Sequence, residues 1–249
     1  MTYCLAMRLD DGLLFLSDTR TNAGVDNVST YRKLHVFRPG DDRLFVLQSA
    51  GNLATTQEVL DRLSRDLAGS GESLSTIDHL FEAALYVGRI SSEVARNHSA
   101  TLGTNANATF ILGGQVGDEP PDILLVYPEG NYIRCSDDRP FLQIGEAKYG
   151  KAWLDLAVRS HADMATAGKI ALSSMAATAL ANLSVGPPYD LGIYRTGTHE
   201  LQHARIDGDS PFLTRLVDVW RDHLLAAVHA LPEIEPGDIA TLAPESRPT

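Results

Sequence analysis

A threonine directly behind the initiator methionine could act as a nucleophile. Thr2 leads into YCLAMRL, an apolar and β-favouring run, so we expect it to be ordered rather than part of a loose terminus. A hydroxyl group keeps its proton at neutral pH and attacks a carbonyl only with a base beside it. If Met1 is removed, the α-amino group of Thr2 has an ordinary pKa of about 7.7 to 8.0 and could be that base.

Asp18 and Lys33 are placed to assist such a nucleophile. Asp18 ends the second of two strand-like runs joined by DDG, and antiparallel pairing returns that end to the start of the first run. Lys33 begins the next strand, and its charge would lower the pKa of the nearby amine and hydroxyl. Asp18 would keep the lysine charged and oriented. Taken alone, however, Thr at position two is common, and the two charged residues favour a surface ion pair.

The hydrophobic periodicity predicts the elements that must position these residues. Alternating apolar runs predict four strands in the first fifty residues, and a period of three to four residues predicts a helix from Asn52. A second helix is expected with Ser75 as its cap. Further strands, a second helix pair from Lys148 onward, two closing strands and a last helix follow, the last with Ser210 as cap and Pro211 at its first position.

This order of elements favours one fold class over another. Strands and helices do not alternate singly, so a doubly wound parallel sheet is disfavoured. Two stacked antiparallel sheets with helix pairs on both outer faces, an α+β four-layer αββα sandwich, would bury the apolar strands LLFLS, LFVLQ and DILLVY on both sides. We expect one domain over residues 1–232 and a loosely ordered tail over 233–249.

Composition excludes several classes of function. The 249 residues carry a formal net charge of -11, which disfavours binding to nucleic acid or an anionic membrane. Two cysteines exclude a disulfide framework and a four-cysteine zinc site. The histidine pair of HELQH, expected on a strand, lacks an obvious third ligand, so no metal site is predicted. Without a secretory signal or a membrane-length apolar run, the predicted location is the cytoplasm.

Several motifs in this order resemble the β-type subunits of the proteasome and its bacterial relatives. They are the Thr2 strand, SDTRT, the lysine that begins the third strand, SAG before a helix, FILGG, DILLVYPEGN and IGEAKYGKAWLD. The resemblance extends from Thr2 to about the last strand. It is greatest to the bacterial Anbu branch, in which the nucleophile also follows the initiator methionine without a propeptide.

The resemblance implies an N-terminal nucleophile hydrolase that needs no cofactor. Thr2 would attack a peptide carbonyl, with its α-amine as proton shuttle and Asp18 and Lys33 in support. Gly51 would offer its backbone N–H to the oxyanion, aided by the positive end of the helix from Asn52. Four residues would line the substrate pocket: Thr21, Tyr31, Ser49 and Leu53.

The resemblance also implies partners. They are a peptide or unfolded-protein substrate and further copies of the chain in a homo-oligomer, as an open or a closed assembly. The sequence neither indicates nor excludes an unfoldase.

Two departures from the family pattern bear on activity. Glu146 stands near the place of a serine that helps to hold the terminal amine, and Asn182 or Ser184 stands where the family often has an aspartate. Three hypotheses therefore remain: a threonine endopeptidase, a hydrolase of small amides that uses the same Thr2, and a catalytically weak scaffold subunit that self-assembles.

Overall fold

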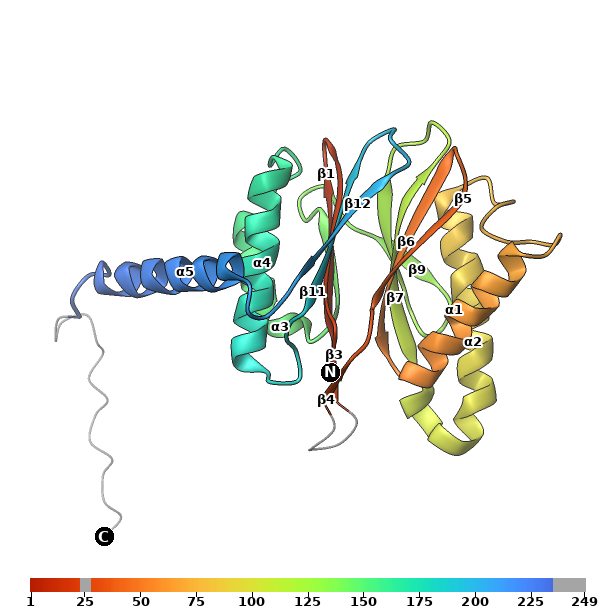
Figure 1. Cartoon of the computed structure of the whole chain (residues 1–249), viewed down its shortest axis with the longest axis horizontal. Helices are drawn as coiled ribbons and strands as arrows, with labels where there is room; N and C mark the ends of the chain where they lie inside the picture. The colour runs from red at the N-terminus through yellow and green to blue at the C-terminus, as the bar shows by residue number, and fades with distance from the viewer. Residues whose placement is uncertain (23–27, 235–249) are drawn as a thin grey trace, which may run out of the picture.

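Two five-stranded antiparallel sheets face each other and are covered by helices on both outer sides (Figure 1). The computed structural model describes residues 1–22 and 28–234. The first sheet has the order β10 (Phe141–Gly145), β1 (Tyr3–Leu9), β2 (Gly12–Asp18), β11 (Tyr189–Arg195) and β12 (Leu201–Ile206). The second has the order β5 (Leu34–Gly40), β6 (Arg43–Gly51), β7 (Ala108–Val116), β8 (Asp122–Val126) and β9 (Tyr132–Arg134).

Each sheet has its own helix pair, which confirms the predicted αββα sandwich (Figure 1). The second sheet is covered by α1 (Leu53–Leu67) and α2 (Leu80–Leu102), and α2 continues into the short 3-10 helix η1 (Gly103–Ala106). The first sheet is covered by α3 (Ala147–Ala157) and α4 (Met164–Ala181). The last helix, α5 (Pro211–His229), projects away from this body. None of the described helices is long and apolar enough to span a membrane.

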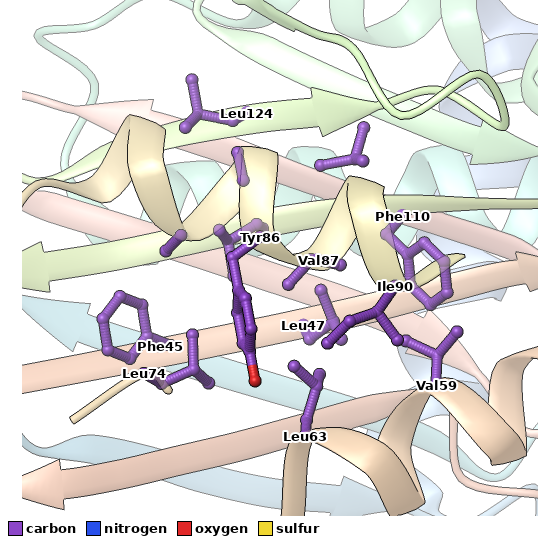
Figure 2. Close-up of a cluster of buried hydrophobic side chains, with 14 of the residues drawn as sticks. Phe45, Leu47, Val59, Leu63, Leu74, Tyr86, Val87, Ile90, Phe110 and Leu124 are labelled. Atoms are coloured by element: carbon purple, nitrogen blue, oxygen red, sulfur yellow. The ribbon is translucent and has the colours of Figure 1, made fainter. Parts of the chain in front are cut away.

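Strands β1, β2, β6 and β7 are buried on both faces because three apolar clusters separate the four layers, whereas the edge strand β12 is largely exposed. Along β2, Leu14 and Leu16 pack in the cluster beneath α3 and α4, while Leu13 and Phe15 pack between the sheets. Figure 2 shows the third cluster, where side chains of β6 and β7 meet α1 and α2. Full burial of one such side chain contributes about 1.5 to 3 kcal/mol. The clusters therefore hold the strand ends, and the residues on them, in fixed positions.

Helix α1 begins where the sequence predicts. Asn52 is its N-cap, and the side chain accepts a hydrogen bond of 3.1 Å from the backbone N–H of Thr55. The predicted start of α2 at Ser75 is wrong, because that helix begins at Leu80. A turn intervenes: the Ser73 carbonyl accepts the Thr76 N–H at 3.0 Å, and Arg43 binds the Ser75 carbonyl at 2.9 Å. These bonds satisfy the backbone in a non-helical conformation.

Three further expectations are corrected or left open. The polar segment after Asp18 contains two short paired strands that were not predicted, β3 (Arg20–Asn22) and β4 (Val28–Thr30). His199 lies before β12, so the HELQH spacing does not place both histidines on a strand. The domain limit at residue 232 stays a prediction, and the tail from residue 235 lies outside the described residues.

Candidate active site

A buried ion pair lies beneath the start of the chain. The Lys33 ammonium donates a hydrogen bond of 2.7 Å to Asp18 Oδ1. It also donates to the Arg20 carbonyl at 2.7 Å and to the Met1 carbonyl at 3.3 Å. The Asp18 side chain is fully buried and that of Lys33 is 7% exposed, so the interpretation as a surface ion pair is wrong.

The Asp18 carboxylate also fixes backbone from two other segments. Oδ1 accepts the N–H of Tyr3 at 2.9 Å, and Oδ2 accepts the N–H of Gly186 at 3.4 Å. Burial raises the pKa of Asp18, while the Lys33 charge and these hydrogen bonds oppose that rise. Asp18 thus connects the residue after Thr2, the lysine and the loop that follows α4.

The end of β10 holds Thr2 from the other side. The Thr2 carbonyl accepts a 2.7 Å hydrogen bond from the N–H of Glu146, in continuation of the β1–β10 pairing. Gly145 permits this approach: its φ is +82°, and a Cβ atom there would lie 2.0 Å from the Thr2 carbonyl oxygen. Sequence reasoning missed Gly145. The glycine that ends FLQIG at a strand-to-helix switch was the available signal.

The two departures from the proteasome pattern contact each other. Asn182 Nδ2 donates a 2.9 Å hydrogen bond to Glu146 Oε2, and Asn182 Oδ1 accepts the N–H of Ser184 at 3.0 Å. The Glu146 side chain is 8% exposed and also lies 3.7 Å from the Lys148 ammonium. Since the Glu146 backbone binds the Thr2 carbonyl, this network joins the segment of Thr2 to the end of α4.

A cleft of about 640 Å³ opens beside Thr2. Its lining includes Thr2, Lys33 and Gly51, whereas Asp18 lies behind Lys33 and does not line it. All four residues predicted for the pocket line the cleft: Thr21, Tyr31, Ser49 and Leu53. Sequence reasoning missed other lining residues, among them Arg32, His35, Asn105 and Asn107. They come from separate segments, and no local motif identifies them.

Gly51 stands where β6 gives way to α1. Its φ of +115° is one that other residues rarely adopt, and a Cβ atom would lie 2.5 Å from the Asn107 carbonyl oxygen. The next residue, Asn52, caps α1, so the N-terminal end of that helix adjoins the cleft. The cleft is therefore surrounded by four groups: the Thr2 hydroxyl, the buried Lys33 ammonium, the Gly51 backbone and the positive end of α1.

Comparison with solved structures shows where this arrangement belongs. The chain is similar to Anbu (ancestral beta-subunit) from Yersinia bercovieri, with a TM-score of 0.89 and 41% identity over 94% of this chain and 99% of that chain. The chain belongs to the Anbu family. Its fold is accordingly the proteasome-like fold, and its family is of the N-terminal nucleophile type.

Two further Anbu structures agree with this assignment. Anbu from Hyphomicrobium sp. strain MC1 matches with a TM-score of 0.86 and 41% identity over 94% of this chain and 100% of that chain. The helical assembly of the Anbu complex from Pseudomonas aeruginosa matches with a TM-score of 0.89 and 38% identity over 95% and 99%. No family model and no curated protein matches this chain.

Proposed function

We propose that this Anbu-family chain is a threonine peptidase in which removal of Met1 exposes the nucleophile Thr2. The observation that carries the proposal is the set of bonds made by Lys33. Two acceptors, Asp18 and the Arg20 carbonyl, fix its ammonium group, and the third is the carbonyl of Met1 itself. Loss of Met1 would leave one N–H of Lys33 directed at the new terminus.

The chemistry follows from that geometry. The Thr2 α-amine takes the hydroxyl proton as Oγ attacks the peptide carbonyl, and the Lys33 charge stabilises the developing alkoxide. The Gly51 N–H and the N-terminal end of α1 stabilise the oxyanion. The amine then gives its proton to the leaving amine, which leaves an ester on Thr2. Water hydrolyses this ester, the amine acting again as base. The reaction balances without a cofactor.

Covalent labelling tests the proposal. The purified protein is first weighed as an intact chain and then incubated with a β-lactone or peptide vinyl sulfone. We expect a chain without Met1, one adduct on Thr2, no adduct in Thr2→Ala and a retained adduct in Thr2→Ser. A retained Met1, or an unlabelled Thr2 at neutral and mildly alkaline pH, would overturn the proposal.

A catalytically weak scaffold is the second candidate function, and the Glu146–Asn182 hydrogen bond favours it. The bond occupies Glu146 Oε2, so this carboxylate is partly committed to the loop after α4 instead of the Thr2 amine. On this hypothesis Glu146→Ser with Asn182→Asp would raise the labelling rate, whereas Thr2→Ala would leave assembly unchanged. A hydrolase of small amides would instead label normally and cleave amides but no peptides.

We further propose that the chain self-associates. The related Pseudomonas aeruginosa Anbu complex is a helical assembly. In this chain α5 projects from the body and exposes apolar side chains, including Phe212 at 57%, Val219 at 50% and Val228 at 63% (Figure 1). Light scattering after size exclusion would give the mass: a multiple of the 27.0 kDa chain is expected, and a monomer would contradict the proposal. A cytoplasmic location stays a prediction.

A further inference from the structure

The lining of the active-site cleft is positively charged in a chain whose formal net charge is -11. Two lining residues are cations, Arg32 and Lys33, and within the described ranges 1–22 and 28–234 no aspartate or glutamate lines the cleft. The acidic residues of these ranges therefore lie elsewhere. A cleft whose charge is opposite to that of the whole molecule attracts negatively charged groups.

Only one of these two cations forms a hydrogen-bonded ion pair with a described residue. Lys33 is neutralised by Asp18 at 2.7 Å. Arg32 Nε lies 4.0 Å from Asp190 Oδ2, beyond hydrogen-bond distance, and its side chain is 57% exposed. Asp190 also faces Arg205 Nη1 at 3.7 Å. Arg205 also lies 3.9 Å from Asp207, so it has a second carboxylate within reach. Arg32 has Asp190 alone among the described carboxylates, at a distance too long for a hydrogen bond, and its N–H groups are open to a ligand in the cleft.

The wall next to Arg32 contains a buried polar atom. His35 lines the cleft, and within the part of the chain that the structure describes its Nε2 atom is buried without a hydrogen-bond partner. Because this atom is already buried, the charged groups that an occupant of the cleft meets are the two cations. Across the cleft, α1 contributes Leu53, Thr56 and Leu60, none of which is charged.

We propose that the cleft selects substrates with an acidic side chain, Asp or Glu, on the acyl side of the cleaved bond, and that Arg32 determines this preference. The inference rests on the proposed function. A carbonyl held between Thr2 and Gly51 places the side chain of its own residue in the same cleft, since both residues line it. A carboxylate there meets the exposed guanidinium of Arg32 and can accept hydrogen bonds from its N–H groups.

Matched covalent probes test the preference. Three peptide vinyl sulfones that differ only in Glu, Gln or Leu next to the reactive group are incubated with the full chain, and labelling rates at Thr2 are read by intact mass. The Glu probe is expected to react about 5-fold faster than the Gln probe, the size typical of a partly exposed charge pair. The ratio should fall at high ionic strength.

Two variants locate the effect. In Arg32→Gln the Glu-to-Gln ratio is expected to fall to about one. In Arg38→Gln it should be retained, because Arg38 is an exposed arginine of β5 that does not line the cleft and pairs with Glu200. A ratio near one in the unaltered chain, a faster Leu probe, or a ratio unchanged by Arg32→Gln would each overturn the inference.

A binding arm separates this inference from the proposed function. If no probe modifies Thr2, the proposed peptidase fails, but Thr2→Ala protein can still be titrated with fluorescent peptides that end in Glu or Gln amides. Anisotropy should show about 5-fold tighter binding of the Glu peptide, lost in Arg32→Gln. Equal binding of the two peptides would overturn the inference independently of catalysis.

Discussion

The Asp18–Lys33 pair offers the sharpest test of how the site is held. Each partner is almost fully buried, and removal of one partner leaves the other charge in a low-dielectric environment. We expect Lys33→Met to lower the free energy of unfolding by about 3 kcal/mol and Asp18→Asn by a similar amount. In Lys33→Met the N–H groups of Tyr3 and Gly186 still bind the carboxylate, so the loss should lie at the lower end of the range for buried pairs.

The double variant measures the coupling energy between Asp18 and Lys33, which the single variants do not give. Asp18→Asn with Lys33→Met removes both charges together, so its loss should be smaller than the sum of the two single losses by about 2 kcal/mol. Urea unfolding at one fixed protein concentration measures all three variants. Arg38→Met is the control, because that arginine belongs to an exposed pair with Glu200 and should cost less than about 0.5 kcal/mol.

The pH dependence of Lys33→Met follows from the same burial. Burial already raises the pKa of Asp18, and loss of the lysine charge removes the main opposing influence. The folded variant then binds a proton more tightly than the unfolded chain, so its deficit relative to the unaltered protein should shrink as the pH falls. Additive losses in the double variant, or a deficit for Lys33→Met that grows with acidity, would refute the reasoning.

Three other predictions concern single positions. Gly145→Ala should lower the free energy of unfolding by several kcal/mol and abolish labelling of Thr2, because the Cβ atom would lie 2.0 Å from the Thr2 carbonyl oxygen. Gly117→Ala is the control, since Gly117 also has a positive φ but lies in open space. It should lower the free energy of unfolding by about 1 kcal/mol and leave labelling intact. Burial lowers the pKa of His35 to about 4, so the contribution of His35 to the free energy of unfolding should be constant above about pH 6.5. In urea titrations this free energy should fall by on the order of 2 kcal/mol towards pH 4. His35→Gln should reduce this dependence on pH. Burial raises the pKa of the Cys135 thiol to about 11, so a disulfide reagent at pH 8 should modify it only after unfolding; rapid reaction of the native protein would contradict this.

The Anbu likeness and the layer order were accessible from the sequence because they depend on local patterns. Strand and helix periods, the Asn52 cap and the order of motifs are properties of short segments. The start of α2 was not accessible from the sequence, because Arg43, which binds the turn before this helix, comes from a distant strand. The short β3–β4 ribbon also escaped prediction, because its segment reads as polar loop.

For the site, the sequence by itself determined the candidates Thr2, Asp18 and Lys33 through their types and their places at strand ends. The resemblance to the proteasome family added Gly51. Only the tertiary structure decided that the ion pair is buried, that Glu146 bonds to Asn182, and that Arg32 and His35 share a cleft with Thr2. The physical reason is that burial and charge balance depend on segments far apart in the chain. Asp18 and Gly186 are 168 positions apart and meet only when β2 and β11 pair.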